Sequence, residues 1–400
     1  MKKFFVPFII LMICCFLTQS AGAVVLKTAS SFAGNDTVAD VYAGLLRLWQ
    51  EKTNHTVIDS SRTADEDWKI SVLNDFAAGN EADILFFFAK TADNAPLLGK
   101  VVPISEINAM YPALHLPENS SIAEADGKVY AIPVRTFWEG LFCNVDLFER
   151  CGLELPTTWE KLEKAIQVFN EKGITPIAVS LSDIPNYIAE FSILSAGPAE
   201  HHLARPVKGE AVPQSWIEGM DLIYKLYQMN AFAENVNTTT YATVSQQFCD
   251  KQAAMQLDGS WFANGFPMEN MDNTVVIPFP CYDSQADSSA FIGGVSMGFY
   301  LTRSAWENPE KRDAAVELLA FLATGENAQQ LGGFTFTGKL LESVNMMLEG
   351  HMNPPLQDDM DPHARAIWFG AISGIADGTE DPAAMWETVM NLEPFKEEAK

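Results

Sequence analysis

The sequence is poor in positive charge. It holds 26 Lys and Arg against 52 Asp and Glu in 400 residues, which gives a formal net charge of −26. A surface this negative repels nucleic acid and anionic lipid, so we expect neither as a partner. It also favours a protein that remains monomeric in solution. An acidic docking surface for a cationic partner is the alternative.

Histidines and catalytic motifs are scarce as well. The chain has six histidines, and their only cluster, His201 and His202, lacks acids or cysteines at metal-ligand spacing, so no metal site is expected. The sequence contains no Gly-x-Ser-x-Gly, His-Glu-x-x-His or phosphate-binding loop. The 52 acids could include the carboxylate pair of a glycosidase, but no pair stands out. We therefore expect no cofactor and no catalytic activity.

Long hydrophobic runs are absent except at the N-terminus. Lys2 and Lys3 precede an apolar run from Phe4 to Leu17, and small residues follow at 21–23. This pattern predicts a secretory signal peptide over residues 1–23 and a periplasmic mature protein. Cys14 and Cys15 lie inside the run, where the preceding Ile13 is too bulky for lipoprotein cleavage. No later stretch approaches the roughly 20 apolar residues of a membrane span.

Few cysteines remain beyond the predicted leader: Cys143, Cys151, Cys249 and Cys281. Their spacing matches no metal motif, and an oxidising compartment permits two disulfides with three connectivities. A helix over 146–150 would hold Cys143 and Cys151 about 10 Å apart, too far for a disulfide. Free thiols and disulfides both stay open.

The remaining chain is long enough for two domains. Strand-like runs alternate with amphipathic helices, which predicts an α/β architecture with mainly parallel sheets. The expected strands cover 24–29, 83–88, 174–180 and 253–257, and the expected helices cover 37–52, 67–78, 157–172 and 214–229. We find no internal repeat and no long linker.

Three ordered segments carry a family resemblance: 126–160, with Asp126-Gly-Lys-Val-Tyr-Ala-Ile-Pro133; 248–261, ending in Asp258-Gly-Ser-Trp261; and 291–330, opening with Phe291-Ile-Gly-Gly-Val-Ser-Met-Gly298. Together they resemble the extracellular solute-binding proteins of ABC importers, in the carbohydrate-binding family that includes maltose-binding protein. Cys143 departs from this pattern, because an aromatic residue usually precedes the Asn at 144.

The resemblance implies a two-lobed periplasmic-binding-protein-like fold with a solute in the cleft and membrane permease subunits as partners. It implies a first lobe of 24–133 plus 284–335 and a second lobe of 134–283 plus 336–400. The hinge crossings are then expected near 133–134, 282–284 and 335–338.

Aromatic residues just beyond strands are the first candidates for solute contact. In open α/β sheets ligands bind beyond the carboxyl ends of strands, and pyranose faces stack on aromatic rings. Ordinary core packing is the alternative for each ring. The strand positions favour Phe32, Phe87, Phe88 and Trp138, a loop adds Asn186 and Tyr187, and the resemblance adds Trp261 and Trp368.

Polar candidates could bind the hydroxyls of a sugar: Asp36, Arg62, Lys90, Arg135 and Asp258. Gly293 and Gly294 could let the backbone approach a solute, and a tight turn explains them equally well. If the Arg and Lys side chains converge, an anionic solute is favoured instead. A cationic solute such as a polyamine would require several carboxylates among the aromatics. A sensor subunit that docks a membrane receptor is a further alternative to an importer component.

Overall fold

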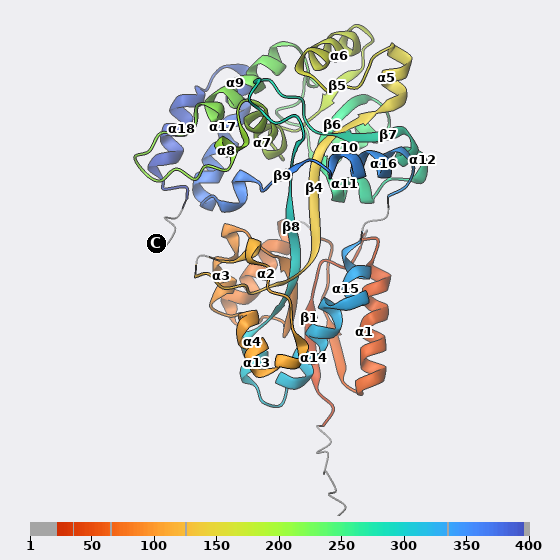
Figure 1. Cartoon of the computed structure of the whole chain (residues 1–400), viewed down its shortest axis with the longest axis vertical. Helices are drawn as coiled ribbons and strands as arrows, with labels where there is room; N and C mark the ends of the chain where they lie inside the picture. The colour runs from red at the N-terminus through yellow and green to blue at the C-terminus, as the bar shows by residue number, and fades with distance from the viewer. Residues whose placement is uncertain (1–21, 35, 65, 125, 334–335, 396–400) are drawn as a thin grey trace, which may run out of the picture.

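A computed structural model describes residues 22–34, 36–64, 66–124, 126–333 and 336–395. Two lobes, one above the other in Figure 1, are joined by two long strands, β4 (Ile132–Asn144) and β8 (Ala290–Leu301). Residues 1–21 of the predicted signal peptide lie outside the described residues. Among the helices that are described, none is both long and apolar enough to cross a membrane.

One sheet runs through both lobes in the order β2-β1-β3-β8-β4-β6-β5, with β7 paired to β4 and β9 paired to β8. The outer pairs β1–β2, β1–β3 and β5–β6 are parallel. The crossing strands run antiparallel to each other, to β3 and to β6. The predicted two-lobed α/β fold is therefore confirmed, with a sheet that becomes mixed where the crossing strands enter.

The first lobe packs around one hydrophobic core that includes Leu26, Phe86, Phe299 and Leu318. Its strands alternate with helices because apolar residues recur at helical spacing; α1, for example, buries Tyr42, Leu45 and Trp49. Its elements are β1 (Val25–Ala29), α1 (Ala39–Thr53), β2 (Thr56–Asp59), α2 (Glu66–Ala78), β3 (Ile84–Phe88), η1 (Ala92–Asn94), α3 (Ala95–Leu98), α4 (Ile104–Met110), η2 (Pro112–Leu114), η3 (Ser120–Ile122), α13 (Arg303–Glu307), α14 (Arg312–Ala323) and α15 (Gly325–Gly332).

The second lobe holds the largest core, which includes Leu141, Trp216, Trp368 and Trp386. Its helix α6 begins where the Thr158 side chain accepts a hydrogen bond from the backbone of Lys161. Its elements are α5 (Val145–Cys151), α6 (Trp159–Glu171), β5 (Thr175–Ala178), α7 (Asn186–Ser195), α8 (Ala199–His202), α9 (Gln214–Gln228), α10 (Tyr241–Cys249), β6 (Ala253–Gly259), α11 (Ser260–Asn264), α12 (Met268–Asn273), β7 (Thr274–Ile277), α16 (Gly338–Met347), β9 (His351–Asn353), η4 (Leu356–Asp359), α17 (Pro362–Asp377) and α18 (Pro382–Asn391).

The chain crosses between the lobes within the paired strands β4 and β8. Ile132 at the start of β4 packs in the first core, whereas Leu141 packs in the second. On β8, Ile292 lies in the second core and Met297 in the first. This crossing thus lies about ten residues beyond the expected 282–284, because β8 begins inside the second lobe. A third crossing falls between Leu331 and the start of α16.

All four cysteines among the described residues are free. Cys143 lies in the middle of the second core, where burial raises the pKa of its thiol. Cys151, Cys249 and Cys281 are partly buried.

Candidate functional site

An aromatic platform lies on the second lobe where β4, β6 and α7 come together. The Trp261 ring stands at the start of α11, 5.9 Å from the ring of Phe137 and 6.1 Å from that of Tyr187. Trp261 is 37% exposed, unusual for so large an apolar side chain in a cluster of rings. Exposed aromatic faces of this kind are suited to stack on a solute.

Gly259 allows the platform to form. A Cβ atom at Gly259 would lie 2.4–2.6 Å from three ring atoms of Trp261, so the indole folds back over a position that only glycine leaves open. Gly259 pairs with Glu139 in the neighbouring strand. Paired residues project from the same face of a sheet, so the Glu139 side chain lies on the face that carries the Trp261 ring.

Carboxyl groups surround this platform. Glu139 and Asp258 are buried on β4 and β6, Glu190 lies one turn beyond Tyr187 on α7, and Asp358 lies on η4. Asp258 accepts hydrogen bonds from the Gln256 side chain at 2.7 Å and from its neighbour's backbone N–H at 2.8 Å. Elements far apart in the chain therefore place four acids together.

Burial and mutual repulsion change the ionisation of these acids. Burial raises the pKa of Asp258 to about 7, although hydrogen bonds from Gly259 and Gln256 partly offset it. Burial, then repulsion from Glu190, Asp358 and Asp258, raises the pKa of Glu139 well above its usual range. Burial and repulsion from Glu190 raise the pKa of Asp358 to about 7. Asp258 and Asp358 therefore change their ionisation near neutral pH.

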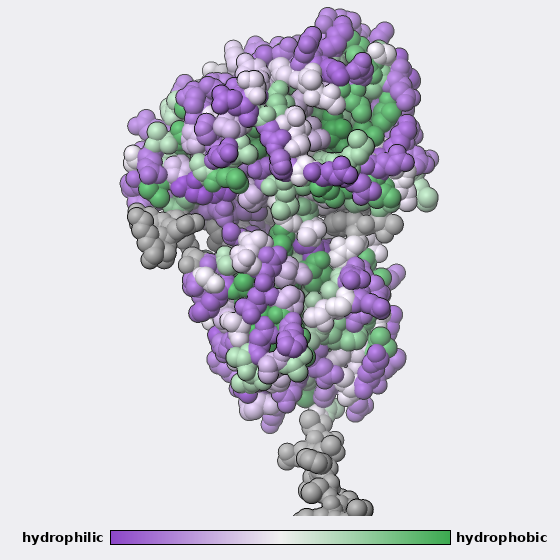
Figure 2. Space-filling model, viewed as in Figure 1, coloured by the Kyte–Doolittle hydropathy of each residue, from purple (hydrophilic) through white to green (hydrophobic). Residues whose placement is uncertain are grey.

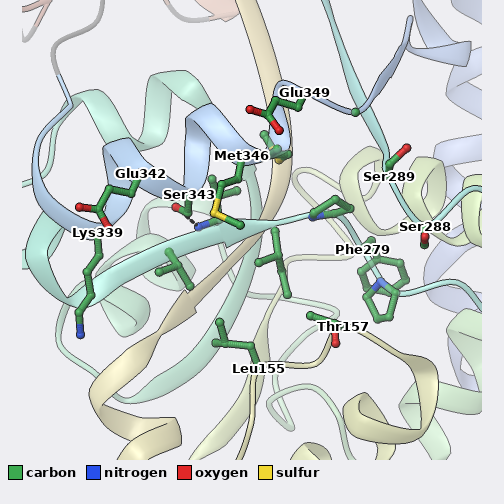
Figure 3. Close-up of a pocket in the computed structure, with 17 residues that line it drawn as sticks. Leu155, Thr157, Phe279, Ser288, Ser289, Lys339, Glu342, Ser343, Met346 and Glu349 are labelled. Atoms are coloured by element: carbon green, nitrogen blue, oxygen red, sulfur yellow. Dashed lines mark hydrogen bonds between the residues drawn. The ribbon is translucent and has the colours of Figure 1, made fainter.

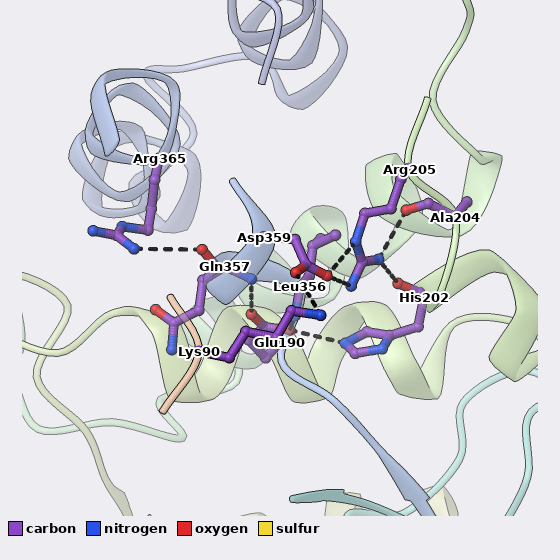
Figure 4. A network of polar contacts seen from close by, with 9 residues as sticks. All are labelled: Lys90, Glu190, His202, Ala204, Arg205, Leu356, Gln357, Asp359 and Arg365. Atoms are coloured by element: carbon purple, nitrogen blue, oxygen red, sulfur yellow. Dashed lines mark hydrogen bonds and ion pairs between the residues drawn. The ribbon is translucent and has the colours of Figure 1, made fainter. Parts of the chain in front are cut away.

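Glu190 has both of its carboxylate oxygens hydrogen-bonded, and its bonds reach other segments of the lobe. Its carboxylate accepts the backbone N–H groups of Leu356 at 3.0 Å and Gln357 at 2.8 Å, and lies 2.8 Å from Nε2 of His202. Figure 4 shows Glu190 at the centre of this network. These bonds hold the 356–359 segment, and with it Asp358, against α7.

Ion pairs connect the two lobes next to the acids. Asp93 of the first lobe lies 2.9 Å from Arg365 of the second lobe and 2.7 Å from Lys69 of its own. Lys90 of the first lobe lies 3.6 Å from Asp359, which also binds Arg205 at 2.9 Å. Figure 4 shows Lys90 among these second-lobe residues. The acids of this surface therefore border the first lobe. In the space-filling view the broader second lobe meets the narrower first lobe (Figure 2).

The structure brings part of the predicted site together. Asn186, Tyr187, Asp258 and Trp261 gather on the second lobe, within or beside the platform. On the first lobe, Lys90 takes part in the interlobe ion pairs. Phe88, the other first-lobe candidate that remains partly open, lies beneath Lys69, whose Nζ is 5.5 Å from the ring centre.

Four predicted aromatic contacts belong to the hydrophobic cores instead. Phe32 stacks on Phe86, 4.3 Å between ring centres, and Phe87 packs against Trp68. Trp138 packs in the small cluster around Phe142. Trp368 is 0% exposed and packs on Trp386 in the second core. We leave these rings out of the proposed site because core side chains enclose them.

The remaining predicted residues stabilise the crossing or face solvent. Arg135 forms a two-pronged pair with Asp36 at 2.7 and 3.0 Å, and its guanidinium lies 4.6 Å from the centre of the Phe32 ring. Arg62 is exposed. Gly293 and Gly294 pair with β4 in the crossing region. A Cβ atom at Gly293 would approach the carbonyl oxygen of residue 137 to 2.8 Å, so this glycine permits close strand packing.

Sequence reasoning missed Phe137, Glu139, Glu190 and Asp358. One signal was available: Glu190 is a lone acid among apolar neighbours in the segment Ile188-Ala189-Glu190-Phe191. Such an acid is buried only with partners, which makes it a functional or structural candidate.

A pocket of about 510 Å³ lies elsewhere, in the second lobe between β7 and α16 (Figure 3). Its lining is mainly apolar, with Val275, Phe279, Met346 and Met347, and no first-lobe residue contributes to it. It lacks the combination of an exposed ring and buried acids. Within the described ranges, no group of His, Cys, Asp and Glu could hold a metal ion.

Two α/β lobes connected by crossing strands, with an aromatic and acidic surface where they meet, define a two-lobed binding protein. A family model described as bacterial extracellular solute-binding protein matches residues 29–329. The chain belongs to this family.

A curated relative is similar to this chain in sequence, and solved structures share its fold. The melibiose/raffinose/stachyose-binding protein MelE of Bacillus subtilis (strain 168) is 23% identical over 226 residues, which are 54% of this chain and 52% of MelE. The chain thus aligns with about half the length of MelE. A chitin oligosaccharide binding protein has a TM-score of 0.76 at 16% identity, over 92% of this chain and 98% of its own. RafE in complex with raffinose has a TM-score of 0.67 at 16% identity, over 92% and 100%.

Proposed function

We propose that the protein is the solute-binding component of an ABC importer. It captures a sugar or oligosaccharide between its lobes outside the cytoplasm, acts as a monomer without a chemical step, and delivers the solute to a membrane permease. The family assignment supports a binding role. MelE, RafE and the chitin oligosaccharide binding protein each bind a sugar, which supports a carbohydrate as the solute.

The observation that carries the proposal is the exposed Trp261 ring beside Tyr187, Phe137 and the buried carboxyls. A pyranose presents apolar C–H faces that stack on such rings and hydroxyls that bond to carboxyl and amide groups. Both kinds of partner lie within this one surface, and first-lobe residues border it through Lys90 and Asp93.

The mechanism we infer is closure about β4 and β8. The solute binds the platform first, and first-lobe groups then close over it, so that the closed form is favoured by its additional contacts. The permease recognises that closed form.

The anionic alternative loses support because the cations it needs do not converge. Arg135 is paired with Asp36, Lys90 with Asp359, and Arg62 is exposed. An anion placed beside Glu139 and Asp258 would add repulsion to a site that is already acidic.

A thermal-shift screen against neutral, acidic and amine-bearing sugars tests the proposal, followed by a tryptophan fluorescence titration with each hit. Trp261→Ala should weaken sugar binding by about 2 kcal/mol or more while the melting temperature without sugar changes little. Tyr282→Ala is the control, because Tyr282 is an exposed aromatic of the same lobe outside the platform. Unchanged affinity in Trp261→Ala, or no response to any sugar, would reject the proposal.

A further inference from the structure

Charge around the aromatic platform is unevenly compensated. The nearby cations are already paired: Lys69 and Arg365 with Asp93, and Lys90 and Arg205 with Asp359. Adding Glu139, Glu190, Asp258 and Asp358 gives six carboxyls against these four cations. The site therefore carries an excess of acid even after its interlobe ion pairs are counted.

Glu139 is the least compensated of these acids. It is 3% exposed, and the described residues provide no hydrogen-bond or ion-pair partner for its carboxyl. Every charged group that acts on it is another acid: Glu190, Asp358 and Asp258. An unpaired buried carboxyl of this kind is costly when it is ionised, so its charged form needs a compensating partner such as a ligand.

A second unpartnered polar group lies close by. Ser260 is fully buried between Asp258 and Trp261 in the chain, and its hydroxyl has no hydrogen-bond partner among the described residues. The register of β4 against β6 places Glu139 on the face that the Trp261 ring covers. Two unpartnered polar groups therefore lie in the part of the second lobe that carries the exposed Trp261 ring.

We propose, on the basis of the sugar-binding function above, that the solute carries an ammonium group, and that this group binds between Glu139 and Asp258 against the rings of Trp261 and Tyr187. Carboxylates give an ammonium group charge-assisted hydrogen bonds, and aromatic faces attract it through their quadrupole. A neutral sugar would use the same rings but would leave the acid excess uncompensated.

Binding of such a cation releases protons. Burial, then the neighbouring Glu190, Asp358 and Asp258, raises the pKa of Glu139 and favours its protonated form in the free protein. The Tyr187 hydroxyl also faces this carboxyl. An ammonium group favours the ionised carboxylates instead. Since the pKa of Asp258 is raised to about 7, affinity for the amine should increase as the pH rises through that value, as long as the amine stays charged.

Matched sugars test this inference by isothermal titration calorimetry. One probe pair is glucose and 6-amino-6-deoxyglucose. The other probes are mono- to tetrasaccharides of glucosamine, each compared with its N-acetylated counterpart, which keeps the nitrogen but removes its charge. We expect an amine-bearing probe to bind about ten-fold or more tightly than its neutral counterpart at pH 7. Titration of 6-amino-6-deoxyglucose in two buffers of different ionisation enthalpy should show net proton release.

Glu139→Gln keeps the shape of the side chain but removes the charge that would pair with the ammonium group, so it should reduce the preference for amines to less than about three-fold. The control is Glu317→Gln, an exposed glutamate on α14 of the first lobe. If Glu139→Gln does not fold, proton release by the wild-type protein decides the question.

The outcomes separate this inference from the proposed function. Neutral sugars that bind as tightly as amines, without proton release, overturn the ammonium assignment and leave the sugar-binding function in place. Absence of binding by any of these sugars overturns the carbohydrate function itself.

Discussion

The Asp93 ion pair should control how readily the lobes separate. Asp93 touches cations of both lobes, with Arg365 Nη2 at 2.9 and 3.1 Å and Lys69 Nζ at 2.7 Å. Burial alone would raise the pKa of Asp93, but the hydrogen bonds and charges of Lys69 and Arg365 outweigh it and lower the pKa. The carboxylate is therefore charged across the whole neutral range, and Asp93→Asn removes that charge with little change of shape.

The expected size of the effect of Asp93→Asn follows from how deeply the ion pair is buried. The side chains of Asp93 and Arg365 are 12% and 17% exposed, so solvent screens their attraction only in part. A charge-assisted hydrogen bond in such a setting contributes about 1–2 kcal/mol, which is more than an exposed ion pair contributes and less than a fully buried one. Asp93→Asn should therefore lower the ratio of contacting to separated lobes by roughly five- to thirty-fold.

Small-angle X-ray scattering measures this change, because separation of the lobes raises the radius of gyration. Sugar affinity should fall by up to the same factor if the bound form has its lobes in contact. High salt should raise the radius of gyration of the wild-type protein toward that of the variant and should change the variant less. Asp75→Asn, an exposed aspartate on α2, is the matched control.

Scattering curves and sugar affinities of Asp93→Asn that match those of Asp75→Asn would refute the reasoning. In that case the interlobe ion pairs would be exchangeable surface contacts, and the position of the lobes would depend on β4 and β8 alone.

Three further substitutions test other parts of the structure. Arg135→Gln removes the buried pair with Asp36 and should cost about 3–5 kcal/mol in urea unfolding, whereas exposed Arg62→Gln should stay within about 0.5 kcal/mol. Burial raises the pKa of Asp258 from 3.8 to about 7, so the free energy of unfolding should decline from pH 4 to pH 7, and Asp258→Asn should flatten that decline. Gly259→Val should displace the Trp261 ring, shift its fluorescence and weaken sugar binding, while far-UV circular dichroism stays unchanged.

The fold was predictable because its signals are local. Hydrophobic periodicity located α1, α2 and β3 to within a few residues, and the ordered motifs around 126–160 and 248–261 indicated two lobes. The second crossing lies farther along the chain than expected, because nothing in the local sequence indicates where a long strand such as β8 leaves one core for the other.

The site was only partly predictable because it depends on register and distance. Asp258 lies near the end of β6 and Trp261 follows it, so their place beyond a strand end could be inferred. Glu139 appears in the sequence as a polar residue within a strand, and only its pairing with Gly259 brings it beside the indole ring. Conversely, Trp368 was expected to contact the solute on the same grounds as Trp261, but it packs entirely inside the second core.

The most direct measurement is a crystal structure with the sugar that binds most tightly in the thermal-shift screen. The account predicts a sugar ring stacked on Trp261 within about 4 Å, beside Tyr187 and Glu139, with first-lobe residues in contact with its opposite side. A sugar bound only outside this surface, for instance in the pocket between β7 and α16, would contradict it.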